Sequence, residues 1–80
     1  MEEILRLINA DRELSDTEIL AVFDYIGKMA DIILFKNDGL RSSGKFTVVI
    51  IHDGEAIRYD DATLDSALIK SLKAYVKLKE

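Results

Sequence analysis

The stretch that decides the fold is Lys45–Tyr59, KFTVVIIHDGEAIRY, in which two runs of strand-forming residues flank Asp53-Gly54. β-Branched residues fill the first run, and Asp-Gly is a preferred pair for a two-residue hairpin turn, which needs positive φ at both positions. The segment is therefore predicted to form a β-hairpin. Its turn fixes the register of the two strands, which pairs Ile51 with Ala56, Ile50 with Ile57 and Val48 with Tyr59.

Both faces of this hairpin carry apolar side chains near the turn. Because successive side chains of a strand point to opposite faces, the register divides them into two sets. One set is Phe46, Val48, Ile50, Ile57 and Tyr59, and the other is Thr47, Val49, Ile51, Ala56 and Arg58. An antiparallel sheet that packs on helices at one side needs only one apolar face. The second face, with Val49, Ile51 and Ala56, is therefore a candidate interface.

The segment before the hairpin, Asp31–Lys36, allows two interpretations. Its four consecutive apolar residues are typical of a buried strand, yet Ile33 also continues the apolar stripe of the preceding helix. A strand is favoured over the end of a long helix, because an isolated two-stranded hairpin is only marginally stable in water.

Three helices complete the predicted fold. Glu2–Asn9 is too short to be stable alone and must dock on the rest. Ser15–Glu18 has the pattern of a capping box and begins a helix that extends to about Met29. The last helix begins near Thr63, a favourable N-cap residue, and repeats an apolar side chain at every fourth position, namely Leu64, Leu68, Leu72 and Val76.

These elements predict one small α+β domain over residues 1–80. A short N-terminal helix and a long helix precede an antiparallel β-meander of two or three strands. The C-terminal helix then packs on one face of the sheet, which buries an apolar stripe of the helix against an apolar face of the sheet.

Composition narrows the ways in which so short a chain is stabilised. A domain of 80 residues buries only about 60–65% of its unfolded surface, and such domains often use disulfides, a metal or a partner subunit. The chain has no cysteine and one histidine, which excludes disulfides and thiolate or histidine-rich metal sites. We therefore expect no cofactor, and a stabilising partner that is either another protein or a second copy of this chain.

The charge distribution bears on that partner. Of the net charge of −4, the excess lies in residues 1–31, which carry eight acidic and three basic side chains. This distribution disfavours nucleic acid as a partner, because nucleic acid needs clustered Lys and Arg, and it suits a basic protein.

No apolar run reaches the roughly 18–20 residues that span a bilayer, and Met1-Glu2-Glu3 lacks the basic region of a secretory signal. The expected location is the cytoplasm, with no membrane contact.

The loop before the hairpin partly matches a phosphate-binding loop. Gly39–Lys45 has the required glycine and lysine spacing, but Phe46 stands where that motif needs Ser or Thr to hold magnesium. A strand also follows where the motif needs a helix, which disfavours nucleotide hydrolysis. A weaker form of binding stays open, in which the loop gathers an anion. Its candidate contacts are Arg41, Ser42, Ser43, Lys45 and Arg58.

No arrangement of residues predicts catalysis or a metal site. The only histidine, His52, lies at the hairpin tip, and no serine has a predicted base beside it. We expect His52 and Glu55 to form a cross-strand pair, because a metal site needs more ligands than this tip can bring together. Asp60 and Asp61 precede the last helix, where capping accounts for them. The chain is therefore expected to have no enzymatic activity.

From Ser15 to the end, the expected order of elements resembles that of double-stranded-RNA-binding domains, which run α-β-β-β-α. That family carries a basic cluster at the start of its last helix. The matching positions here are Asp60, Asp61 and Asp65, whose negative charge repels phosphate. The resemblance therefore implies a topology, together with weak or lost nucleic-acid binding.

The sequence favours a small acidic protein-interaction module that inhibits or adapts a protein partner, with self-association as one form of that binding. The candidate interface residues are Tyr25, Val49, Ile51, Ala56 and Tyr75. One alternative is a binding domain for an anionic small molecule or nucleotide near Arg41, Lys45 and Arg58. The other is the RNA-binding-domain-like fold just described.

Overall fold

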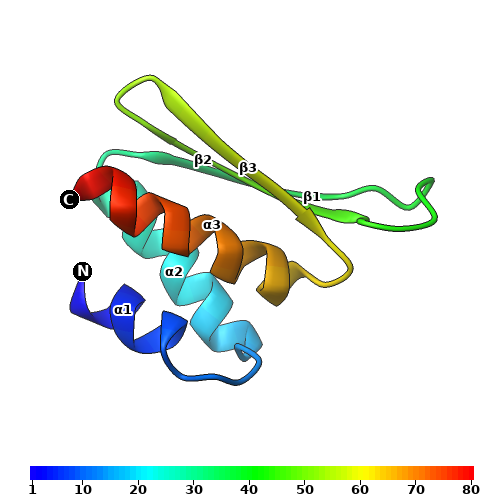
Figure 1. Cartoon of the computed structure of the whole chain (residues 1–80), viewed down its shortest axis with the longest axis horizontal. Coiled ribbons are helices and arrows are strands. Elements are labelled where there is room, and N and C mark those ends of the chain that lie inside the picture. The colour runs from blue at the N-terminus through cyan, green and yellow to red at the C-terminus, as the bar shows by residue number, and fades with distance from the viewer.

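The computed structural model describes all residues, 1–80, and has an α+β fold with a three-stranded antiparallel sheet. Helices α2 and α3 lie against one side of this sheet, and α1 packs on α3 (Figure 1). The chain termini lie near each other at one end of the helical layer (Figure 1). In chain order the elements are α1 (Glu2–Ile8), α2 (Asp16–Lys28), β1 (Ile32–Asn37), β2 (Phe46–His52), β3 (Glu55–Asp61) and α3 (Leu64–Lys79).

The predicted hairpin is confirmed, with its register. Strand β2 pairs with β3 so that Ile51 lies opposite Ala56 and Val48 opposite Tyr59. Both turn residues have positive φ, 53° at Asp53 and 81° at Gly54, as a tight hairpin turn between twisted strands requires.

The segment after α2 is a strand, which resolves the two interpretations left open by the sequence. Strand β1 pairs antiparallel with β2, and the sheet order is β1-β2-β3. The helix ends because Ala30 adopts φ 63° and its amide donates to Gly27 O, while the Asp31 amide donates to Ile26 O. These two bonds form a Schellman motif, which closes the last turn of α2 and redirects the chain into β1.

The start of α2 is a capping box, as predicted. Ser15 Oγ accepts a hydrogen bond from the Glu18 amide at 3.2 Å, and Glu18 Oε1 accepts one from the Ser15 amide at 2.9 Å. Arg12 also donates to both carboxylate oxygens of Glu18, at 2.8 and 2.7 Å. The bonds from Arg12 and then from Ser15 hold the pKa of Glu18 at about 2, well below its usual range. The long helix is thereby fixed to the connection that leads in from α1.

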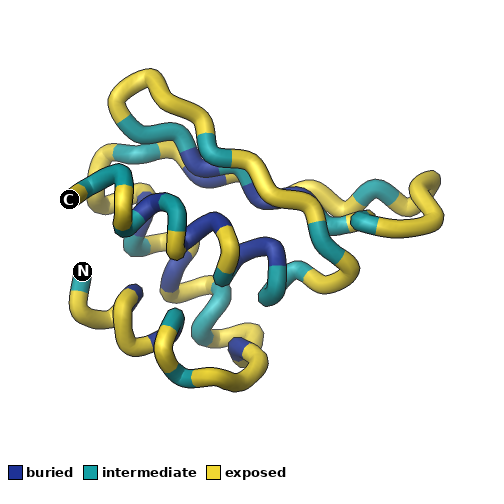
Figure 2. The backbone as a smooth tube through the Cα atoms, in the orientation of Figure 1, coloured by how far each residue is buried: buried dark blue, intermediate teal, exposed yellow.

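The core is one cluster of buried apolar side chains between the sheet and the helices. Figure 2 shows its buried positions along the middle strand and along α3, with the hairpin tip exposed. The short helix α1 contributes Ile4 and Leu7, so it docks as expected. The members of the cluster are Ile4, Leu7, Leu14, Val22, Ile26, Ile33, Val48, Ile50, Ala67, Leu68, Leu72 and Tyr75.

Candidate functional site

The face of the sheet turned away from the helices is the main candidate surface, and we call it the outer face. Residues paired directly across strands share a face, so the register arranges its side chains in three rows. The first row is Ile32, Ile51 and Ala56, the second is Leu34, Val49 and Arg58, and the third is Lys36, Thr47 and Asp60. Figure 1 shows that no helix covers this side of the sheet.

The first two rows give the outer face an apolar end. Ile32 is 53% exposed and Leu34 is 54% exposed, whereas Ile33, between them in the chain but on the helical side, is buried. Val49 and Ile51 are half-buried, and Ala56 is exposed. Three of the residues predicted for an interface, Val49, Ile51 and Ala56, therefore lie together on this face. Ile32 and Leu34 were missed, because the sequence left open whether their segment was a strand.

The third row and the neighbouring loop give the outer face a polar end centred on Asp60. Its carboxylate accepts a hydrogen bond from Thr47 Oγ1 at 2.5 Å and lies 3.5 Å from both Arg41 Nη1 and Arg58 Nε. The bond from Thr47 lowers the pKa of Asp60 most, and the charges of Arg58 and Arg41 add to this against the opposing effect of desolvation. The carboxylate is therefore ionised and bonded at neutral pH.

This arrangement bears on the candidate anion contacts. The structure brings Arg41 and Arg58 together, but on the carboxylate of Asp60, which neutralises part of their charge. Lys45, Ser42 and Ser43 are exposed, and their side chains make no hydrogen bond or ion pair within the chain. An incoming anion would have to displace Asp60 from two arginines. Anion binding at this loop stays a prediction.

The two tyrosines proposed as surface contacts have different positions. Tyr75 is fully buried, so its prediction as an interface residue is wrong. It lies on the edge of the apolar stripe of α3, and the sequence alone did not show that the strand ends would cover that edge. Tyr25 is half-buried against the core, and its hydroxyl accepts a hydrogen bond from the Met1 amine.

Burial of Tyr75 reveals a polar cluster that the sequence did not predict. The carboxylate of Asp31 accepts a hydrogen bond from Tyr75 Oη at 2.5 Å and lies 2.8 Å from His52 Nδ1. Lys79 Nζ is 3.6 Å from the same carboxylate, and the His52 ring meets the Tyr75 ring edge-on at 6.1 Å between centroids. The register pairs His52 with Glu55 as predicted, but the His52 side chain turns to Asp31 instead.

The electrostatics of this cluster follow from burial and pairing. Desolvation is the largest effect on Asp31 and raises its pKa, but the hydrogen bonds from Tyr75 and His52, with the charges of His52 and Lys79, together lower it below its usual value. Burial first, and then the bond to Asp31, raises the pKa of the Tyr75 hydroxyl. Tyr75 therefore stays protonated and donates to an ionised Asp31. The cluster joins the start of β1, the end of β2 and α3, and in this role it anchors the C-terminal helix.

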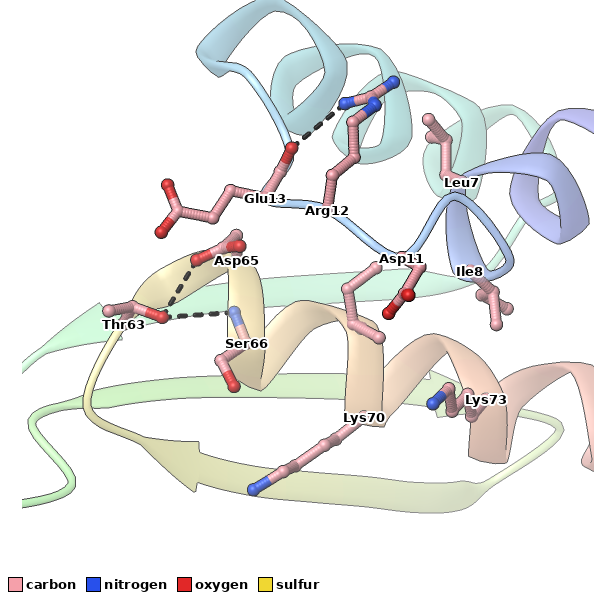
Figure 3. Close-up of a pocket in the computed structure, with 11 residues that line it drawn as sticks. Leu7, Ile8, Asp11, Arg12, Glu13, Thr63, Asp65, Ser66, Lys70 and Lys73 are labelled. Carbon is pink, nitrogen blue, oxygen red and sulfur yellow. Dashed lines mark hydrogen bonds between the residues drawn. The ribbon is translucent and has the colours of Figure 1, made fainter.

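A shallow groove of about 540 Å³ lies between the α1–α2 connection and the first half of α3 (Figure 3). Both signs of charge line it, with Asp11 and Glu13 on the connection and Lys70 and Lys73 on α3 (Figure 3). Lys70 is engaged with Asp61, at 2.6 Å from its carboxylate. No group of three or more His, Cys, Asp or Glu side chains is placed to hold a metal ion. This groove lacks the convergent buried polar groups that mark a ligand pocket.

Comparison with known proteins adds no relative. No protein-family model matches the chain, and no curated protein or solved structure matches it either. No helix has both the length and the apolar character needed to cross a membrane.

Proposed function

We propose that this chain is a non-enzymatic protein-binding module whose binding surface is the outer face of the sheet. The observation that carries the proposal is the apolar end of that face, where Ile32 and Leu34 are more than half exposed on a sheet whose other side packs against α2 and α3. A one-sided antiparallel sheet normally alternates apolar and polar side chains, with the polar set facing water. Here the water-facing set is apolar in its first row and largely apolar in its second.

A partner that covers the apolar end of the outer face gains free energy from burial of its exposed side chains. Complete burial of a Val, Leu or Ile side chain stabilises by about 1.5–3 kcal/mol, so covering the exposed halves of Ile32 and Leu34 contributes roughly 1 kcal/mol each. The half-buried Val49 and Ile51 lie between them and the third strand and extend the patch. The rim is polar, with Lys36, Arg58 and Asp60 at its far end. An apolar centre with a polar rim is the usual composition of a protein interface.

The other candidate functions have less support. Anion binding needs Arg41 and Arg58 free, and both contact Asp60. Nucleic-acid binding needs a basic surface, and two acidic residues, Asp61 and Asp65, flank the start of α3. We place the protein in the cytoplasm, which the absence of cysteine permits.

The proposal is tested with two variants of equal charge change. Val49→Lys with Ile51→Lys alters the outer face, and Thr17→Lys with Ala21→Lys alters exposed positions of α2. Each protein is immobilised, and proteins retained from a native lysate are identified by mass spectrometry. We expect a partner retained by the wild type and by the α2 variant to be lost by the outer-face variant. Equal retention of that partner by both variants would exclude the outer face as the binding surface.

A further inference from the structure

We propose that the partner of the outer face is a second copy of this chain, packed face to face about a two-fold axis that runs along β2. This inference rests on the proposed function and specifies its partner. The arrangement of side chains in the three rows makes the outer face complementary to itself. A two-fold interface uses the same patch on both copies, so the patch must match its own rotated image.

The direction of the axis follows from the distribution of polarity along the strands. Rotation about an axis along β2 keeps each row at its own level and places β1 of one copy over β3 of the other. The apolar row of Ile32, Ile51 and Ala56 then lies on the same apolar row of the second copy. An in-plane axis across the strands would instead set this apolar row on the charged row. Stacked sheets pack about 10 Å apart with their strands within about 30° of each other, which preserves this correspondence of rows.

Size and charge both match under this rotation. In the first row, Ile32 of one copy lies over Ala56 of the other, so a large side chain meets a small one. In the third row, Lys36 lies over Asp60 of the other copy, and the rotation repeats the pair at the opposite edge. The Lys36 side chain has room to adjust, since it is 61% exposed and its nearest carboxylate, Asp38, is 3.7 Å away. The Asp60 carboxylate is held in place by Thr47, Arg41 and Arg58, so Lys36 has to reach it.

The second row needs one accommodation, at Arg58, which lies over Leu34 of the other copy. The Arg58 head group is already directed along the strand to Asp60, with Nε 3.5 Å from its carboxylate. Its aliphatic stem is therefore left to cover Leu34, while its charge stays at the polar end. No charge is placed on the apolar row.

The size of the face sets the expected affinity. Three strands about 4.8 Å apart and six residues at about 3.3 Å give a footprint of roughly 300 Å² per copy. A standard stable interface buries about 800 Å² per partner, so the dimer is expected to be weak, with a dissociation constant in the micromolar range or above. Sedimentation equilibrium from about 1 µM to 1 mM covers this range.

The decisive experiment uses charge reversal in two separate chains. Lys36→Asp alone brings two acidic groups together at each edge, and Asp60→Lys alone brings two basic groups together. Each is expected to weaken association roughly tenfold, since two exposed pairs are lost and replaced by repulsion. A mixed dimer of the two variants regains an opposite-charge pair at both edges. An equimolar mixture should therefore associate within about threefold of the wild type.

Controls separate association from folding. Lys73→Asp makes the same charge change on α3, away from the outer face, and should leave the association constant unchanged. Circular dichroism melting at low concentration checks that each variant folds. Asp60→Lys removes the bond to Thr47 and could prevent folding. In that case Lys36→Asp is compared with Lys36→Arg, which keeps the positive charge. Association is expected to weaken in Lys36→Asp and to stay unchanged in Lys36→Arg.

The outcomes separate this inference from the proposed function. A wild type that stays monomeric to 1 mM overturns the second copy as partner, and it leaves the proposed function standing if another protein is retained through Val49 and Ile51. If mixing the two charge variants does not restore association, the face-to-face arrangement is overturned. Association that survives Val49→Lys with Ile51→Lys overturns the second copy as the occupant of the outer face. The proposed function is overturned as well only if a partner retained from the lysate is also unaffected by these two changes.

Discussion

Replacing Asp31 with alanine is expected to be among the most destabilising single changes in this protein. Its carboxylate is 6% exposed and bonds Tyr75 at 2.5 Å and His52 at 2.8 Å, with Lys79 at 3.6 Å. Alanine removes the carboxylate that accepts the hydrogen bond from the buried Tyr75 hydroxyl. The one remaining partner of that hydroxyl is Lys79 Nζ at 3.4 Å, which is a donor and cannot accept its proton.

The magnitude follows from these contacts. Leaving the buried Tyr75 donor unsatisfied costs about 1–3 kcal/mol, and loss of the bond to His52 adds about 1.5 kcal/mol, so we expect about 3 kcal/mol in total. A domain of this size has an unfolding free energy of roughly 4–12 kcal/mol, of which this is a large part. The melting temperature should fall by roughly 15–20 °C.

The assay is urea unfolding followed by circular dichroism, in a double-mutant cycle of Asp31→Ala and Tyr75→Phe. Because both changes break the same hydrogen bond, the double variant should lose about 1–2 kcal/mol less than the sum of the single losses. Asp24→Ala is the matched control, since Asp24 is exposed and pairs only with Lys28 on the surface of α2. Equal unfolding midpoints for Asp31→Ala and Asp24→Ala, or additive losses in the cycle, would refute the anchoring role of the cluster.

Three further predictions concern the same molecule. Ala30→Gly should raise the unfolding free energy by about 1 kcal/mol in urea titration, because Ala30 has φ 63°, where glycine carries no Cβ penalty. Ser15→Ala should lower it by about 1 kcal/mol in the same titration through loss of the N-cap. The pKa of Asp31 is lower in the folded state, so its stabilisation is complete above about pH 4 and is lost as the pH falls through that lowered value. The stability difference between wild type and Asp31→Asn should therefore shrink on acidification, and a constant difference down to pH 2 would contradict this.

Local signals in the sequence predicted the elements whose stabilising contacts are also local. The Asp53-Gly54 turn fixes the hairpin register within a few residues, and the Ser15–Glu18 capping box is complete within one helical turn. The end of α2 was left open because its Schellman motif places alanine where glycine is usual. Without a glycine, the apolar residues that follow were compatible with both a helix and a strand.

The polar cluster could not be predicted from such signals. Asp31 meets His52 across 21 positions and Tyr75 across 44, so only the packed fold brings them together. The same packing buries Tyr75, whose place at the margin of a helical stripe favoured a surface position in the sequence. The apolar outer face was predicted on β2 and β3 because the hairpin register alone determines which side chains share it. Its extension onto β1 needed the third strand.

The meander order leaves two strands with one unpaired backbone edge each, and these edges differ in their resistance to misassembly. Strand β3 has charged side chains at Glu55, Arg58, Asp60 and Asp61, which discourage another strand from adding to it. Strand β1 begins with four apolar residues and has its only charge at Lys36. Heat or acid that loosens α2 would expose β1 first as a template for intermolecular strand pairing. Irreversible precipitation of this protein is therefore expected to begin at β1.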